Sequence, residues 1–357
     1  MNNKVMAEVN NMPSMDFYIR SARPKSADSS VAAYSRIIKK FMDHKNFDEN
    51  SYDQEWVQDI EWIDEKINSL NLKPTTERNY YVALMIITEG YNGGKYSNKW
   101  ENLPEYLHFS NKTDELNKDY NNKVNSNNGL TESQAENLCS VDEIVAVLNK
   151  LTPNIRSYRA GLDWSSGPGA INKSESDTFM AYVLVSLYLE LPLRNELASL
   201  IFITKRDMNA VPMDERQNYF IDNGKEGAEI IRYKYKTVAK HGPITIKLDK
   251  PLTQLLRTWI KYRNISKKIV LDEHNFIFPD LQAKKGSTSS TAELNLTKNL
   301  NRFFILYLGK KISTTLLAKI TTRDKVDPDT LQALALAATR RGTSMGVIAN
   351  IYTGIAN

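Results

Sequence analysis

The sequence predicts a mainly α-helical protein with one small β-sheet, arranged in two domains. Apolar residues recur at three- and four-residue spacing through most of its 357 residues, which is the period of a half-buried helix. β-branched and aromatic residues with partial alternation are concentrated between residues 219 and 248. A polar stretch at 126–137, rich in Asn, Ser and Glu, separates an all-helical first half from this mixed second half, so we expect a linker there.

The composition is that of a soluble globular protein, with 41% hydrophobic and 25% charged residues. The apolar runs are too short to span a bilayer, and residues 1–23 do not form a secretory signal. Cys139 is the single cysteine and the four histidines are scattered, which excludes an internal disulfide and a cysteine-based zinc cluster. Neither glycine signature for a nucleotide phosphate is present, so we expect no cofactor. The cysteine and histidine content leads us to expect no metal and an intracellular, reducing compartment.

The N-terminal half is predicted to be a flexible arm followed by a helical domain. Residues 1–28 show no clear periodicity and predict the arm, and residues 29–125 form the domain. Ser29 and Ser30 are candidate N-caps of its first helix. Its predicted helices cover 31–43, 54–70, 76–89 and 103–124.

The first of these helices carries a basic face opposite its apolar residues Tyr34, Ile37, Ile38 and Phe41. This face either follows DNA phosphates or is simply solvated, and the net charge of +5 is compatible with both interpretations. Candidate DNA-binding residues in this half are Arg36, Lys39, Lys40 and Arg78.

The C-terminal half, 138–357, combines helices with three expected strands. Ser140 and Glu143 have the spacing of a capping box at the start of a helix that runs through Leu151. A helix that is apolar on nearly every face, 179–191, ends before Pro192 and belongs in a core. The strands are predicted at 219–221, 229–235 and 244–248, and helices at 251–263 and from 294 to the end. The last two strands are joined by a hairpin tip, 236–243, which carries Lys236, Lys240 and His241.

Arg194 follows the buried helix directly, in the stretch Pro192-Leu-Arg-Asn-Glu196. A guanidinium at the edge of a core is costly to place without a partner. One interpretation is an ion pair with Glu196 or another carboxylate. The other is an anion site, because the planar guanidinium suits phosphate.

Four features occur in a characteristic order: Arg194, then Lys236-Thr237 at the hairpin tip, then the helix around Ser313-Thr-Thr-Leu-Leu-Ala-Lys319, and last Arg341-Gly-Thr-Ser-Met-Gly-Val-Ile-Ala-Asn-Ile-Tyr352. This order resembles the tyrosine recombinases of the phage-integrase superfamily, most closely the divergent integrases of large eukaryotic DNA viruses. The resemblance spans nearly the whole chain. It implies an all-α, SAM-like core-binding domain and a DNA breaking–rejoining catalytic domain.

The resemblance also implies roles for individual residues. Tyr352 would attack a DNA phosphodiester to form a 3′-phosphotyrosine, and Arg194 would stabilise charge on the phosphate. Lys236, or Lys240 if the hairpin register differs, would protonate the leaving 5′-oxygen. The implied partners are double-stranded DNA and further copies of this chain, as a dimer or tetramer on the DNA. No membrane partner is expected. The location would be a nucleus, viral factory or virion for a viral protein, and otherwise the cytoplasm.

Two positions depart from the family pattern. The second arginine of the H/K-x-x-R box is replaced in Thr315-Leu-Leu-Ala318, and the histidine of the Gly-His-Ser box is replaced by Thr343. Losing one phosphate-oxygen donor costs about 10²–10³ in rate, and losing a proton-transfer group about 10²–10⁴. Ala318 is either native or an engineered substitution. Candidate replacements for the missing charge are Lys319, Arg323, Arg340 and Arg341. The candidate DNA contacts in this half are Lys240 and His241 of the hairpin tip, together with Lys319, Arg340 and Arg341.

The resulting hypothesis is a DNA-binding protein of this family with impaired strand cleavage. The first alternative is an active recombinase or type IB topoisomerase-like enzyme that uses Tyr352. The second is a structural protein that uses the fold to bind other proteins. Tyr352 as an ordinary aromatic residue, and Lys236 as a simple phosphate contact, also remain open.

Overall fold

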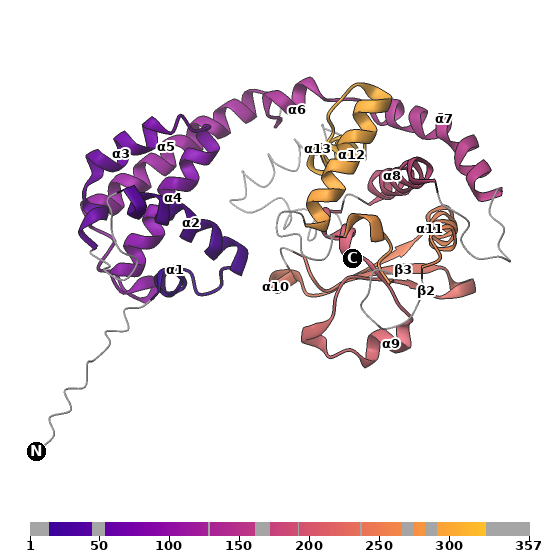
Figure 1. Cartoon of the computed structure of the whole chain (residues 1–357), viewed down its shortest axis with the longest axis horizontal. Coiled ribbons are helices and arrows are strands. Elements are labelled where there is room, and N and C mark those ends of the chain that lie inside the picture. The colour runs from indigo at the N-terminus through magenta and orange to yellow at the C-terminus, as the bar shows by residue number, and fades with distance from the viewer. Residues whose placement is uncertain are drawn as a thin grey trace, which may run out of the picture. The chain divides into compact units, whose positions relative to one another are not determined.

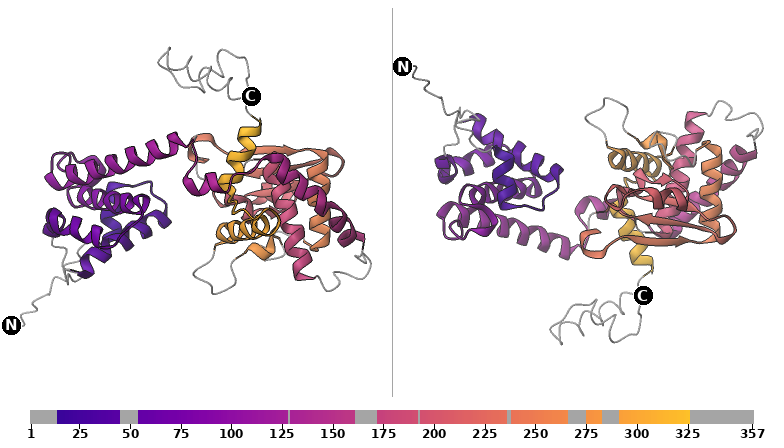
Figure 2. Two further views of the ribbon diagram at one scale, coloured as in Figure 1. Left: turned by 90° about the horizontal axis from the view of Figure 1, so that it is seen from above. Right: turned by 90° about the horizontal axis from the view of Figure 1, so that it is seen from below.

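The computed structural model describes residues 14–44, 54–127, 129–160, 172–191, 193–235, 238–265, 275–282 and 291–325. The chain divides into two compact units, Met1–Glu132 (unit 1) and Ser133–Asn357 (unit 2). Each unit is built from one continuous stretch of chain, as the colours in Figures 1 and 2 show. The predicted fold class is confirmed at its coarse level, because the described chain is mainly helical with one small mixed sheet.

Unit 1 is helical throughout its described residues. Its core is formed by apolar side chains from η1 and from the helices α1 to α5, with Ile38, Phe41, Ile63 and Leu84 at most 1% exposed. The elements are α1 (Met15–Ala22), α2 (Asp28–His44), the 3-10 helix η1 (Gln54–Gln58), α3 (Ile60–Ser69), α4 (Pro74–Tyr91), the 3-10 helix η2 (Gly94–Tyr96) and α5 (Pro104–Ser126).

The prediction of a flexible arm over residues 1–28 is wrong for the part that the structure describes. α1 is capped by Ser14, whose side chain accepts a hydrogen bond from the backbone N–H of Phe17. Met15, Ile19 and Ala22 lie on one face of α1 and are buried against the core. Two turns of helix are too short for a clear periodic pattern, so tertiary packing supplies what the local signal lacks.

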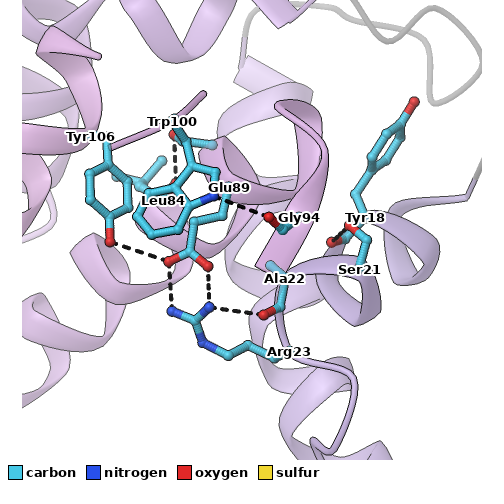
Figure 3. Close-up of polar contacts among 10 residues, drawn as sticks. Tyr18, Ser21, Ala22, Arg23, Leu84, Glu89, Gly94, Trp100 and Tyr106 are labelled. Carbon is cyan, nitrogen blue, oxygen red and sulfur yellow. Dashed lines mark hydrogen bonds and ion pairs between the residues drawn. The ribbon is translucent and has the colours of Figure 1, made fainter. Parts of the chain in front are cut away.

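α1 approaches α4 and η2 unusually closely, at one glycine in each. A Cβ at Gly90 would overlap the carbonyl oxygen of Tyr18, and a Cβ at Gly94 would lie 2.5 Å from the carbonyl oxygen of Ser21. Figure 3 shows Gly94 beside Tyr18 and Ser21, and on the other side the buried carboxylate of Glu89. The glycines let the two backbones approach, which is why a short helix can pack firmly there.

Two element boundaries in unit 1 differ from the prediction. α2 begins at Asp28, one residue before the expected caps Ser29 and Ser30. The expected helix 54–70 is divided at Asp59, whose carboxylate accepts a hydrogen bond from the N–H of Trp62 and caps α3. An Asp in this position competes with the helical backbone for hydrogen bonds, so it starts a new helix instead of continuing one.

The linker predicted at 126–137 is partly helical, because α5 extends to Ser126 and a short helix α6 covers Glu132–Glu136. The boundary between the units falls inside this segment.

The capping box that follows is confirmed: the N–H of Glu143 donates to Ser140 Oγ (3.1 Å), and the N–H of Ser140 donates to Glu143 Oε2 (2.8 Å). The helix it opens, α7 (Val141–Ala160), continues past the predicted end with Pro153 inside it.

Unit 2 contains a four-stranded sheet of order β1-β2-β3-β4, in which β1 and β2 are parallel and the other pairs antiparallel. Both faces of its centre are buried. Tyr219, Ile221 and Ile231 pack on one face, against Met208, while Phe220 and Ile230 alternate with them onto the other. The strands are β1 (Ile201–Phe202), β2 (Tyr219–Asp222), β3 (Ala228–Arg232) and β4 (Ile244–Leu248).

Helices cover this sheet, with α9 on one side and α8 and α11 on the other (Figure 1). α8 is the all-round apolar helix that the sequence predicts, and Phe179 on it packs edge-on against Trp259 of α11. The described chain contains no helix that is both long enough and apolar enough to cross a membrane. The helices are α8 (Lys173–Glu190), α9 (Lys205–Ala210), α10 (Val238–His241), α11 (Lys250–Tyr262), α12 (Ala292–Leu308) and α13 (Thr314–Lys325), with short 3-10 turns η3 (Asn195–Ser199), η4 (Met213–Glu215), η5 (Gly224–Glu226) and η6 (Pro279–Leu281).

Candidate nucleic-acid interface

Arg194 lies at the N-terminal end of η3, directly after α8. The helix ends at Glu190, and Leu191 is extended, as expected for a residue before proline. The hydroxyl of the buried Tyr188 donates a hydrogen bond to the carbonyl oxygen of Arg194 (3.1 Å). Burial raises the pKa of Tyr188, so its hydroxyl stays protonated and holds the Arg194 backbone in place.

The ion pair between Arg194 and Glu196, one of the two interpretations of this stretch, is not formed. Glu196 instead faces Arg232 of β3, with 3.5 Å between the guanidinium and the carboxylate, and both side chains are mostly buried. The Arg232 guanidinium also stacks over the ring of Tyr235 at 4.5 Å. Glu196 therefore faces the sheet, whereas Arg194, two residues earlier, faces solvent.

Asn195, between these two residues, ties η3 to two helices. Its amide nitrogen donates to Thr297 Oγ1 of α12 (3.1 Å), and its amide oxygen accepts from Thr314 Oγ1 of α13 (2.5 Å). The three consecutive residues Arg194, Asn195 and Glu196 therefore face solvent, α12 with α13, and β3, respectively. The backbone that carries Arg194 is held by neighbours far apart in the sequence.

The Arg194 side chain is exposed and forms no hydrogen bond or ion pair with any residue that the structure describes. A rigidly anchored backbone with an unpaired guanidinium is suited to an anion, since little further ordering is needed on binding. This arrangement favours a phosphate group as the ligand.

α13 carries the positions where the resemblance places the second-arginine box. Thr314 binds Asn195, so the structure brings the start of α13 to the turn that holds Arg194. Thr315 is exposed and Ala318 is half-buried on this helix. Lys319 donates to Gln134 Oε1 (2.8 Å), and partial burial together with the charge of Arg323 lowers the pKa of its ammonium group. Lys319 is therefore engaged within the unit, which weakens it as a replacement for the missing arginine.

The tip between β3 and β4 is not the simple hairpin turn that the sequence predicts. It contains the short helix α10, followed by Gly242 in a left-handed conformation, whose carbonyl oxygen accepts a hydrogen bond from Tyr235. His241 is exposed at the end of α10. Lys240 lies on the same turn, and its side chain is outside the described part of the structure.

The candidate DNA-binding residues of unit 1 lie on α2 and α4. Arg36 is exposed on α2, and Lys39 is half-buried beside it. Lys40 donates to the hydroxyl of Tyr80 (3.0 Å), and Arg78 donates to Asn117 Oδ1 (3.0 Å), so both cations bridge helices through neutral groups. Their positive charge remains available to an anion at close range.

Several candidate site residues lie outside the described residues: Lys236, Arg340, Arg341, Thr343 and Tyr352. The described residues contain no group of three or more His, Cys, Asp or Glu side chains arranged to hold a metal ion.

Sequence reasoning overlooked two residues that position Arg194: Asn195 and Arg232. The signal for Arg232 was present, because a single arginine ends the apolar strand Glu229-Ile-Ile-Arg232 and needs a partner when buried. No local signal identifies Asn195, whose partners follow it by 102 and 119 residues.

We compared the chain with models of protein families, with curated proteins and with solved structures, and found no match in any of the three.

Proposed function

We propose that this chain is a DNA-binding protein of the tyrosine recombinase type in which strand cleavage is impaired. The observation that carries the proposal is Arg194, an exposed guanidinium without a partner among the described residues, next to Asn195 and Glu196, which both have one. The order of Arg194, the basic tip and the α13 box along the sequence supports the same proposal, as does the bond between Asn195 and Thr314. The impairment rests on Ala318 and Thr343, which replace the family's arginine and histidine.

Phosphate contacts would supply most of the affinity, which therefore falls steeply with salt. We expect binding of a fluorescently labelled duplex to be measurable by anisotropy over a series of salt concentrations. Arg194→Ala should weaken binding to every sequence about equally and reduce the slope of log K against log salt by about 1.

Arg206→Ala is the matched control for this experiment. Arg206 is also an exposed arginine of unit 2, but it lies on α9, across the sheet from α8 (Figure 1). The two variants change the net charge equally, so only a local role of Arg194 separates them. Equal salt slopes for both variants would contradict an anion site at Arg194, and no salt-dependent binding by the wild type would contradict the proposal as a whole.

The cleavage step is tested separately, by relaxation of supercoiled plasmid without ATP or magnesium and by denaturing gels that trap a covalent adduct. We expect tight binding without an adduct. An adduct that Tyr352→Phe abolishes would instead identify the chain as an active enzyme and would show that another residue replaces the missing arginine.

A further inference from the structure

A groove runs between α8 and α12 on unit 2, and the interface described above does not use it. It consists of two adjoining cavities of about 410 and 440 Å³. Both cavities are bordered by Lys173, Asp177, Asn299 and Arg302, so they form one continuous depression. This volume lies in the range of binding pockets.

One end of the groove is apolar. Ala181 of α8 and Phe303 of α12 are buried there, and the rings of Phe303 and Tyr307 pack with their centroids 4.9 Å apart. Leu306 borders the same end with 71% of its surface exposed. A leucine this exposed beside an aromatic floor is unfavourable in water, and it becomes favourable once a second apolar surface covers it.

Cations border the place where the two cavities meet and the second cavity. Lys173 and Arg302 border both cavities and Lys298 borders the second; all three are exposed, and none has an ion-pair partner among the described residues. Asp177 is the carboxylate shared by both cavities, and Asp280 is already paired with Arg263 (2.9 Å). Three unpaired cations against one unpaired carboxylate favour a ligand with negative charge.

Between the two ends, the side-chain oxygen of Asn299 is buried and has no hydrogen-bond partner. A buried acceptor without a partner is costly, about 1–3 kcal/mol. It borders both cavities, so a donor group lying in the groove can satisfy it.

We propose that this groove binds an acidic amphipathic helix of a partner protein. The apolar face of the helix would cover Phe303, Leu306 and Tyr307, and its carboxylates would face Lys173, Lys298 and Arg302. A groove lined along α12 from Asn295 to Tyr307 fits a helical segment better than a compact small molecule, and recognition by an apolar face is a common mode for such segments. This inference is independent of the proposed function, since Arg194 takes no part in it.

The probe is a fluorescein-labelled helical peptide of about 14 residues, with leucine on one face and glutamate on the other. We expect the full-length protein to bind it, and Leu306→Asp and Arg302→Glu each to weaken binding at least tenfold. A second peptide, with lysine in place of glutamate, should bind the wild type poorly and should gain affinity for Arg302→Glu. That exchange of preference shows that the charge pair is direct.

Leu294→Asp is the matched control, because Leu294 is also exposed on α12 but does not border either cavity. It should leave peptide binding unchanged, and circular dichroism should show that all variants remain folded. The proposal would be overturned by no peptide binding at about 1 mM, by equal losses in Leu294→Asp and Leu306→Asp, or by displacement of the peptide by duplex DNA. A wild-type dimer in light scattering that Leu306→Asp makes monomeric would assign the groove to a second copy of this chain, and would overturn it as well.

Discussion

Glu89 is the carboxylate at the centre of unit 1, with 2% of its side chain exposed. Arg23 donates to both of its oxygens, including a 2.7 Å bond to Oε1, and the hydroxyl of Tyr106 donates to Oε1 at 3.3 Å (Figure 3). Burial and the neighbouring Glu89 raise the pKa of Tyr106 to about 12, so this donor remains protonated. The charge of Glu89 on α4 is thus balanced by Arg23 at the end of α1 and stabilised by a hydrogen bond from Tyr106 of α5.

Arg23→Met should destabilise unit 1 by about 3 kcal/mol, because it leaves a buried carboxylate without its cation. Arg20→Met is the control, since Arg20 pairs with Asp28 at the surface, where 43% and 96% of the side chains are exposed, and such pairs contribute about 0–1 kcal/mol. Urea unfolding followed by tryptophan fluorescence measures both. Equal costs for the two variants would show that the Glu89 pair contributes no more than a surface pair.

Cys139 provides a prediction about pH. Burial raises the pKa of its thiol to about 11, so the folded chain keeps this proton at a pH where the unfolded chain has lost it. The contribution of Cys139 to stability is therefore constant below about pH 9 and falls as the pH rises toward 11. Between pH 9 and pH 11, Cys139→Ala should lose less stability than the wild type.

The burial of Cys139 also predicts slow alkylation. At pH 8, iodoacetamide should alkylate Cys139 much more slowly in the folded protein than in urea, and equal rates would contradict its burial.

At the scale of single elements, the packing of α1 depends on the glycines of α4 and η2 more than on its own length. Gly90→Ala is informative because its intrinsic effect and its packing effect have opposite signs. In an open helix the change stabilises by about 0.5–1 kcal/mol. Here the new methyl group would overlap the Tyr18 carbonyl, and overpacking costs about 1–3 kcal/mol.

We therefore expect Gly90→Ala to lower the stability of unit 1 and to increase amide hydrogen exchange in α1 selectively. Exchange measured by mass spectrometry on peptides covering residues 15–22 tests this. A stabilised variant with unchanged exchange would mean that α1 does not pack on α4 as closely as described.

At the scale of the whole molecule, the two units have separate cores, because the core of unit 1 contains residues from α1 to α5 alone. Such units are expected to unfold as separate cooperative transitions. Calorimetry of the full chain should show that Arg23→Met lowers one transition, by roughly 10 °C. Asn195→Ala should lower only the other, because it removes the bonds from η3 to α12 and α13. A single transition that moves with both variants would contradict this independence.

The sequence by itself determined the type of most elements and many of their ends. The all-round apolar pattern of α8, the capping box at Ser140 and Glu143, and the proline after Leu191 are local signals, and local hydrogen bonds and sterics decide these features. The sequence also identified Arg194 as a candidate anion-binding residue.

The tertiary structure decided which partner each polar residue has. Glu196 binds Arg232 instead of Arg194, and Asn195 binds Thr297 and Thr314, because strands and helices from distant parts of the sequence meet at η3. The tertiary structure also decided where α1 packs, since its close approach to Gly90 and Gly94 depends on contacts between residues far apart in the sequence. Periodicity along a chain reports which face of an element is buried, but the neighbour that buries it is a property of the assembled core.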